Sequence, residues 1–114
     1  MHELGIMEST MAAVLDAVRA KGAQRVHRIV LRVGALSGAE PDALRFAFEV
    51  VARGTPAEDA VLDIDLVAAR ALCAACGVEF EAGTGFITEC PTCHRLSGDL
   101  RHGRELELTR VEMS

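Results

Sequence analysis

The chain has 114 residues, half of them hydrophobic, and a formal net charge of −5 at pH 7. Its length fits one domain or one domain with a small insertion. The acidic balance argues against a nucleic-acid partner, because such proteins present basic surfaces to phosphates. No apolar run reaches the roughly 20 residues that span a bilayer, and the N-terminus lacks the basic-then-apolar pattern of a signal peptide, so we expect a cytoplasmic protein with no membrane partner.

The start of the chain predicts a helix followed by a strand. Apolar residues recur at three- and four-residue spacing from Glu3 to about Lys21, and Gly22 then provides a C-terminal stop. The run VHRIVLRVG at 26–34 alternates apolar with charged residues, which is typical of a strand with one buried face. The residues expected on that buried face are Ile29, Leu31 and Val33.

A second helix and two more strands follow. Pro41 suits the first turn of a helix that continues to about Gly54, with acidic residues where the helix dipole favours them. The run VLDIDLVAA at 61–69 predicts a second strand, and RELELTRVEM at 104–113 a third. In the second strand, the residues expected to face inward are Leu62, Ile64 and Leu66.

These elements predict an α+β fold in which two helices lie on a three-stranded mixed sheet. The segment 70–98, which contains all the cysteines, interrupts the order of strands before the last one. We therefore expect it to form an inserted zinc-ribbon-like module, while residues 1–69 and 99–114 together form the α+β domain.

The four cysteines have the spacing of metal ligands. They form the pattern C-x2-C-x13-C-x2-C in a chain without a secretory signal, which favours metal ligation over disulfides. Each pair can place two thiolates on a tight turn, and two facing turns give a tetrahedral site, with a redox dithiol pair as the alternative. The expected ligands are Cys73, Cys76, Cys90 and Cys93.

Sites of four thiolates hold zinc or iron. The knuckles C-x-x-C-G and C-P-x-C resemble those of rubredoxins, which carry one iron for electron transfer and surround it with aromatic residues. This segment offers only Phe80 and Phe86, so zinc is the expected metal, in a closed structural site that folds the surrounding loop. His94 follows Cys93 directly and is expected in solvent, the alternative being that it replaces a thiolate.

The opening residues MHE contain a second set of metal donors. The α-amine of Met1 with the amide nitrogen and imidazole of His2 can reach one ion, and the amide of Glu3 completes four nitrogens near a plane, which suits Ni(II) or Cu(II). Such binding would strengthen from mildly acidic to neutral pH as amine and imidazole lose protons. The residues alone leave open a terminal histidine without a role, and the donor types favour Cu(II) over Ni(II).

Over essentially its whole length the chain resembles the HypA/HybF family of hydrogenase maturation nickel chaperones. The shared features are the initial MHE running into a helix, the block IVLRVGALSGAEPDALRFAFE, the strand AVLDIDLV, and the paired C-x-x-C knuckles before a final strand. The resemblance implies a nickel domain built from 1–69 and 99–114, with a zinc domain at 70–98 inserted between its parts.

The resemblance also implies site residues. Nickel capture would fall to Met1, His2 and Glu3, with Glu40 recruited from the loop ahead of the second helix. Some relatives carry a histidine near each Cys pair, whereas here only His94 does so, after the second pair. A zinc site that exchanges two thiolates for two histidines is therefore not expected. The other two histidines, His27 and His102, are expected to be structural or solvated.

The implied function is a metallochaperone that holds Ni(II) transiently and delivers it during [NiFe]-hydrogenase maturation, with Zn(II) as a structural metal. The implied partners are a HypB-type GTPase and the [NiFe]-hydrogenase large-subunit precursor, and some relatives also serve the urease system. The exposed faces of the strands leave a monomer and a weak dimer open.

Two other classes of protein fit parts of the sequence. A zinc-ribbon protein-interaction module would need the cysteine pairs but not the N-terminus, and a rubredoxin-like electron carrier would hold iron. The sequence contains no Gly-rich phosphate loop and no H-E-x-x-H motif, and it nominates no Ser–His–Asp arrangement, so we do not expect an enzyme.

Overall fold

The computed structural model describes residues 2–114, and the chain divides into two compact units. Unit 1 comprises the chain up to Leu31 together with 39–65 and 107–114. Unit 2 comprises 32–38 and 66–106. Within residues 2–114, no helix is long and apolar enough to cross a membrane. The assignment of one domain to nickel and the other to zinc stays a prediction.

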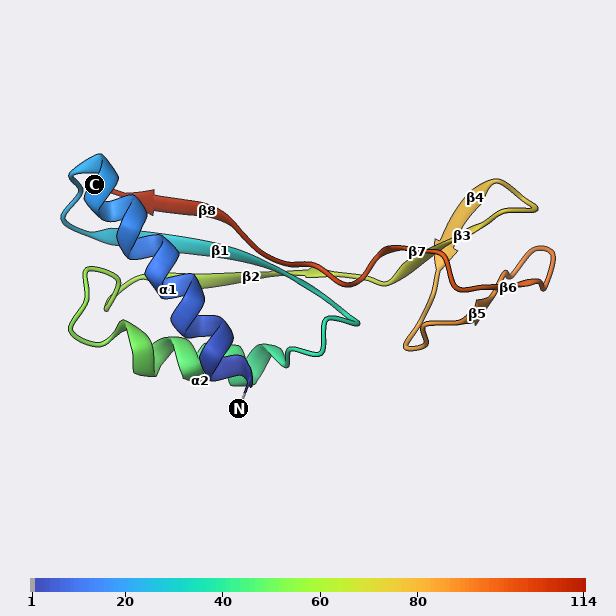
Figure 1. Cartoon of the computed structure of the whole chain (residues 1–114), viewed down its shortest axis with the longest axis horizontal. Coiled ribbons are helices and arrows are strands. Elements are labelled where there is room, and N and C mark those ends of the chain that lie inside the picture. The colour runs from blue at the N-terminus through green and yellow to red at the C-terminus, as the bar shows by residue number, and fades with distance from the viewer. Residues whose placement is uncertain (1) are drawn as a thin grey trace. The chain divides into compact units, whose positions relative to one another are not determined.

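A three-stranded sheet with two helices forms the larger part of the chain. Its elements are α1 (His2–Lys21), β1 (Val26–Gly34), α2 (Pro41–Ala52), β2 (Val61–Val67) and β8 (Leu106–Met113). The strand order is β2-β1-β8, and Figure 1 shows β1 and β2 running in one direction and β8 in the other. The predicted class, two helices with a mixed sheet and a zinc-ribbon-like module, is confirmed.

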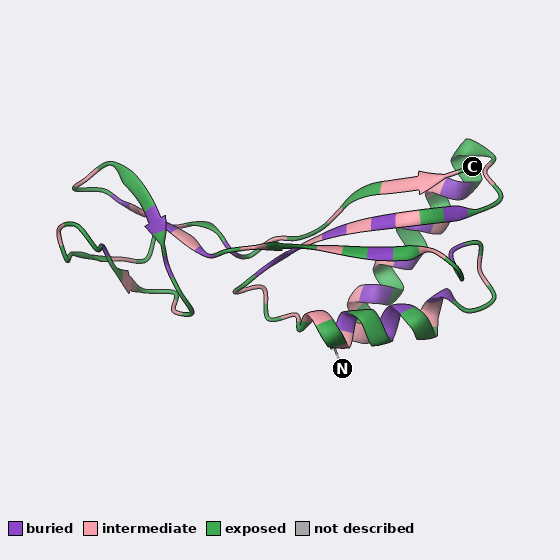
Figure 2. Cartoon of the chain, turned by 180° about the vertical axis from the view of Figure 1, so that it is seen from behind, coloured by how far each residue is buried: buried purple, intermediate pink, exposed green. Residues whose placement is uncertain are grey.

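The core of unit 1 follows the periodicity of the sequence. The buried residues of α1 and α2 recur every three or four positions, so each helix buries one face (Figure 2). On β1, Ile29 and Leu31 are buried as alternation predicts. The buried helical residues are Met7, Met11, Val14 and Val18 of α1, and Leu44, Ala47, Phe48 and Ala52 of α2.

The alternation of apolar and polar residues does not predict burial at the end of β2. Leu62 is buried and Ile64 half-buried, but Leu66, predicted to face inward, is 65% exposed. The helices pack against the beginning of this strand, where the Arg45 guanidinium of α2 donates to the Leu62 carbonyl at 3.0 Å. An alternating pattern reports burial only where something covers the strand, so the prediction for Leu66 was wrong.

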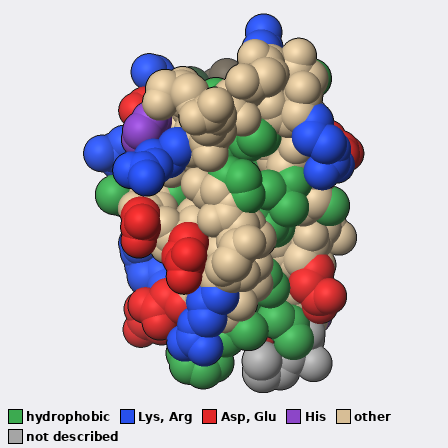
Figure 3. Space-filling view, turned by 90° about the vertical axis from the view of Figure 1, so that its left-hand side faces the viewer, with side chains coloured by type: hydrophobic (Ala, Val, Ile, Leu, Met, Phe, Trp, Pro, Cys, Tyr) green, Lys and Arg blue, Asp and Glu red, His purple; other side chains and the backbone are tan. Residues whose placement is uncertain are grey.

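The solvent-facing side of the sheet is held by charge rather than by apolar contact. Arg28 on β1 lies 3.1 Å from the Asp63 carboxylate on β2 and 3.9 Å from that of Glu112 on β8. Arg110 adds a contact of 3.0 Å with Glu112. The end of unit 1, by contrast, has a central band of apolar side chains flanked by charged ones (Figure 3). These contacts keep an uncovered sheet face soluble but contribute little individually to stability.

Unit 2 is built from short strands that sequence periodicity did not predict. They are β3 (Arg70–Cys73), β4 (Val78–Glu81), β5 (Thr88–Glu89), β6 (Leu96–Ser97) and β7 (Leu100–His102). They form one sheet of order β4-β3-β7 and a two-stranded sheet β5-β6. Their shared core is small and is lined by Ala69, Ala71, Cys73, Phe80, Ala82 and Cys90.

Two glycines allow extended segments of unit 2 to lie unusually close together. Gly34 donates its N–H to the Glu105 carbonyl at 2.7 Å, and Leu36 donates to the Gly103 carbonyl at 2.7 Å. A Cβ on Gly34 would lie 2.2 Å from the carbonyl carbon of Gly103. Gly103 itself has φ +124°, and a Cβ there would lie 2.9 Å from Cα of Ala69. Only glycine fits these two positions.

Gly34→Ala should therefore lower the free energy of unfolding by about 2 kcal/mol or more, because the backbone of Gly103 has to move. The matched control is Gly5→Ala on α1, where an added Cβ meets nothing within 4 Å. That control should raise stability by about 0.5–1 kcal/mol through helix propensity. Chemical unfolding followed by circular dichroism measures both changes, and equal effects at the two glycines would contradict the close packing.

Candidate metal sites

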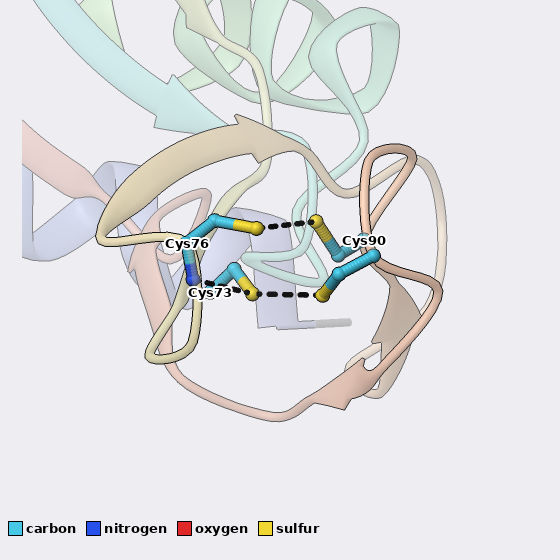
Figure 4. Close-up of side chains that lie close together, drawn as sticks. Cys73, Cys76 and Cys90 are labelled. Carbon is cyan, nitrogen blue, oxygen red and sulfur yellow. Dashed lines mark hydrogen bonds between the residues drawn. The ribbon is translucent and has the colours of Figure 1, made fainter.

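Four cysteine sulfurs from two turns converge in unit 2. Cys73 ends β3 and Cys76 follows it in a tight turn, while Cys90 and Cys93 come from the turn between β5 and β6. The Sγ atoms of Cys73 and Cys93 are 3.5 Å apart and those of Cys76 and Cys90 are 4.0 Å apart (Figure 4). All four sulfurs lie within 4.8 Å of one another.

The two turns that carry the cysteines have the same local geometry. The N–H of Gly77 donates to the Cys73 carbonyl at 2.7 Å, and the N–H of His94 donates to the Cys90 carbonyl at 2.9 Å. Both donors adopt a left-handed conformation, with φ +71° at Gly77 and +65° at His94. Each C-x-x-C is thus closed by the residue after its second cysteine, and this fixes the direction of both thiol pairs.

The cluster has the size of a tetrahedral four-sulfur site. Metal–sulfur bonds of about 2.3 Å in a tetrahedron place the sulfurs about 3.8 Å apart, and the two measured separations lie on either side of that value. Cys73 and Cys90 are 2% and 1% exposed, so these two residues are shielded from solvent. The four residues could therefore hold one metal ion with little rearrangement.

The thiols of Cys76 and Cys90 differ in their readiness to ionise in the metal-free chain. The backbone N–H groups of Cys93 and Thr92 lower the pKa of Cys90 to about 6. The thiols of Cys93 and Cys73 raise the pKa of Cys76 to about 12, because a proton there is shared among neighbouring sulfurs. Metal binding has to displace such protons, so the apparent affinity of the site should rise with pH.

The His94 side chain lies outside this cluster. It is 70% exposed, and its Nδ1 is 3.7 Å from the Glu89 carboxylate. The backbone of His94 shapes the second turn, a role that Gly77 fills in the first. A non-glycine residue in a left-handed turn gives no sequence signal, so the sequence pointed only to the imidazole of His94.

A second set of predicted ligands lies at the start of α1. Met1 falls outside the described residues. The Nε2 atom of His2 lies 3.4 Å from a carboxylate oxygen of Glu3, with the two side chains 59% and 12% exposed. The same oxygen of Glu3 accepts the backbone N–H of Glu40 at 3.2 Å. The structure therefore brings His2, Glu3 and the main chain of Glu40 together.

The Glu40 carboxylate has a different task in this conformation. It accepts the N–H of Ala43 at 2.8 Å and thereby caps α2. Among residues 2–114, the one group of three or more His, Cys, Asp or Glu side chains close enough to share an ion is the cysteine cluster. The carboxylate of Glu40 is thus near the predicted nickel ligands in the fold but is directed to its own helix.

The electrostatics of Glu3 favour its charged form. The hydrogen bond from the Glu40 N–H is the largest cause, and it lowers the pKa of Glu3 together with the N–H of Glu3 itself and the nearby His2. A carboxylate that stays ionised beside an imidazole is suited to attract a cation or to orient the ring.

The two remaining histidines contact side chains away from both sets of ligands. Nε2 of His27 lies 2.6 Å from the Ser114 hydroxyl in unit 1. In unit 2, His102 lies between the carboxylates of Glu79 at 3.6 Å and Glu105 at 3.4 Å. Its contact with Glu79 could not be predicted from the sequence, because Glu79 lies on β4, far from His102 and Glu105 in the chain.

Comparison with known proteins identifies similar chains over nearly the full length. The family model described as hydrogenase/urease nickel incorporation, metallochaperone, hypA matches residues 1–113. Hydrogenase maturation factor HypA of Chloroflexus aurantiacus is 40% identical over 112 residues, covering 98% of both chains. That of Methylocella silvestris is 42% identical over 113 residues, covering 99% of both.

Two solved structures are similar in fold. The solution structure of the Ni metallochaperone HypA from Helicobacter pylori aligns with a TM-score of 0.66 at 24% identity, covering 97% of this chain and 96% of that one. A second solution structure of a HypA protein aligns with a TM-score of 0.72 at 25% identity, covering 100% of this chain and 97% of that one.

Cys90→Ser should abolish tight metal binding at the cysteine cluster and disorder unit 2, because three thiolates leave the closed site incomplete. The matched control is His94→Gly, which removes the imidazole and suits the left-handed turn, so metal should be retained. Elemental analysis of the dialysed protein and amide spectra of 66–106 measure both. Loss of metal in His94→Gly would show instead that the imidazole is a ligand.

Glu3→Gln should lower the free energy of unfolding of the metal-free protein at pH 7, because the Glu40 N–H then donates to a neutral acceptor instead of a carboxylate. Because the pKa of Glu3 is lower in the folded state, its contribution is present above the unfolded value of about 4.3 and is lost as pH falls through the folded value. The difference from the parent, measured by urea unfolding, should therefore shrink as the pH falls below the unfolded value. Glu8→Gln, on the exposed side of α1, should change stability little at either pH.

Proposed function

The chain belongs to the HypA family of metallochaperones for nickel incorporation into hydrogenase and urease, and on that premise we propose that it binds one Ni(II) ion at its N-terminus and delivers it during [NiFe]-hydrogenase maturation. The observation that carries this proposal is the start of α1, where the Glu3 carboxylate lies between the His2 imidazole and the Glu40 N–H. Nickel here is cargo, so the site has to release it as well as bind it.

The helical start of the chain suits a chelate formed by consecutive nitrogens. The first turn of an α-helix leaves its N–H groups outside the ladder of helical hydrogen bonds. A helical ψ near −42° also brings neighbouring backbone nitrogens closer than an extended chain does. In the proposed site, the amine of Met1, the amide and imidazole of His2, and the amide of Glu3 surround the ion.

Glu3 and Glu40 have different roles in the proposed site. The ionised carboxylate of Glu3 orients the imidazole of His2 and supplies negative charge beside the cation. Glu40 joins only after its carboxylate releases the Ala43 N–H, at a cost of about 1 kcal/mol for the lost helix cap. That cost makes Glu40 an exchangeable ligand, which suits a site from which an acceptor protein removes the ion.

The cysteine cluster is proposed to hold Zn(II) permanently. Four thiolates at tetrahedral separation suit zinc, and the few aromatic residues of unit 2 do not provide the surroundings expected for a rubredoxin-like iron. The two sites would then differ in purpose: a closed cage of four side chains retains its metal, while an open terminal chelate loses its ligands one at a time.

The proposed partners follow from the different roles of the two metal sites. A HypB-type GTPase would supply any GTP hydrolysis, the [NiFe]-hydrogenase large-subunit precursor would receive nickel, and the urease system would be a further client, all in the cytoplasm.

The alternative function is a protein-interaction module without nickel transfer. It is favoured by two exposed apolar residues of unit 2, Ile87 and Leu96, which are 70% and 72% exposed.

The test is a titration of Ni(II) into zinc-loaded protein that begins at Met1, followed by absorbance and calorimetry. We expect about one nickel per chain, with binding weaker at mildly acidic pH because the nitrogens are then protonated. His2→Ala should weaken binding on the order of tenfold or more, because a chelating imidazole is lost.

The matched control is the same chain with a short N-terminal extension, which turns the terminal amine into an amide and leaves every side chain in place. It should lose nickel while retaining zinc and the fold. Equal nickel binding by the native and extended chains would exclude the N-terminal chelate. Absence of binding in both would favour the interaction module instead.

A further inference from the structure

The strand β2 forms an open edge of the sheet in unit 1. It pairs with β1 on one side only, since the strand order is β2-β1-β8. The carbonyl of Val67 accepts the N–H of Ala35, which continues β1, whereas the carbonyl of Leu62 is bound by the Arg45 side chain. Because main-chain groups alternate in direction along a strand, Leu62 and Ile64 direct their N–H and C=O groups away from β1.

Neither proline nor lysine blocks this edge against another strand. β2 has the sequence VLDIDLV, so its charged residues are two aspartates, which oppose an acidic strand but not a basic one. The Arg45 guanidinium covers only the carbonyl of Leu62. An extended peptide could therefore continue the ladder at Ile64, the mode of recognition known as strand addition.

A groove lies beside this edge and is also part of unit 1. Its volume is about 530 Å³, and its lining includes Arg45, Phe48 and Glu49 of α2, Glu58 and Asp59 of the following loop, and Leu62 of β2. Phe48 and Leu62 give it an apolar floor, while the carboxylates outnumber the basic groups around its rim. Side chains on one face of an added strand would enter this groove.

The charges on the solvent-facing side of the sheet alternate from strand to strand. Glu112 of β8 lies beside Arg28 of β1, and Arg28 lies beside Asp63 of β2. An opposite charge directly across two strands stabilises their pairing. A strand added next to β2 would continue this alternation with a basic residue opposite Asp63.

A second copy of this chain is a poor occupant of the same edge. In a symmetric antiparallel pair of β2 strands, residues of one face meet residues of the same face. In every register that pairs the middle residues of the two strands, Asp63 or Asp65 of one copy would therefore face an aspartate of the other. Like charges directly opposite each other destabilise strand pairing. The edge thus discourages self-association while remaining open to other strands.

From these contacts we propose that β2 and its groove bind an extended segment of a partner protein in which basic residues alternate with apolar ones. The segment pairs its backbone with Leu62 and Ile64 at the sheet edge. Its basic side chains lie over Asp63 and Asp65, and its apolar side chains enter the groove against Phe48. The surface is independent of the proposed nickel site, so each can fail without the other.

The probe is a blocked synthetic peptide, about as long as β2, in which Arg and Val alternate, compared with one in which Glu and Val alternate. We expect the basic peptide to shift the amide signals of β2 and Ala60. It should slow hydrogen exchange at the Ile64 amide about tenfold at saturation, because that N–H gains an acceptor. The acidic peptide should do neither.

A charge-swapped variant tests the recognition itself. Asp63→Lys combined with Asp65→Lys should weaken the basic peptide about tenfold and make the acidic peptide the tighter ligand. The matched control is Glu8→Lys with Asp16→Lys on α1, which changes the net charge equally but should keep the original preference. Circular dichroism checks that both variants fold.

Three results would overturn the proposal. The first is equal binding of the two peptides, which would mean that the surface does not distinguish basic from acidic side chains. The second is binding that leaves the Ile64 amide unprotected, which would place the peptide elsewhere. The third is self-association of the chain, detected by light scattering and lost in the charge-swapped variant, which would make a second copy the occupant.

Discussion

The convergence of four sulfurs is the constraint on which unit 2 depends. Its strands are two to four residues long, and ladders this short are not stable in water on their own. Its core includes Cys73 and Cys90 themselves, so the residues that would bind metal also supply apolar packing. A metal ion at this point would replace the hydrophobic core that unit 2 is too small to build.

Unit 1, by contrast, is stabilised by a hydrophobic core, and this accounts for the difference between the two candidate metal sites. Its core of helix and strand residues forms without any metal donor, which leaves the first residues of α1 at its margin. The contact between Glu3 and Glu40 joins the starts of α1 and α2. A site fixed to a stable scaffold on one side and open to solvent on the other is compatible with ion exchange, whereas a site that holds its own unit together is not.

Most of unit 1 could be predicted from the sequence because its elements are long enough to show a period. β1 was expected at 26–34 and is found there, and the start of α2 follows from Pro41 and the acidic residues beside it. Leu66 was missed because burial depends on what covers a strand. The short strands of unit 2 were missed because their pairing depends on residues brought together only by folding. The turn at His94 and the cap formed by Glu40 are local, but a left-handed non-glycine residue has no sequence signal and glutamate is not among the usual N-cap residues.

The strand order has a consequence for synthesis of the chain on the ribosome. β1 is the central strand, and one of its neighbours, β8, is the last element of the chain. Both helices and β2 emerge first, but the sheet stays incomplete on one side until all of unit 2 has been made. Nascent chains halted within the cysteine segment would therefore leave β1 with an unpaired edge, the state in which sheet proteins aggregate.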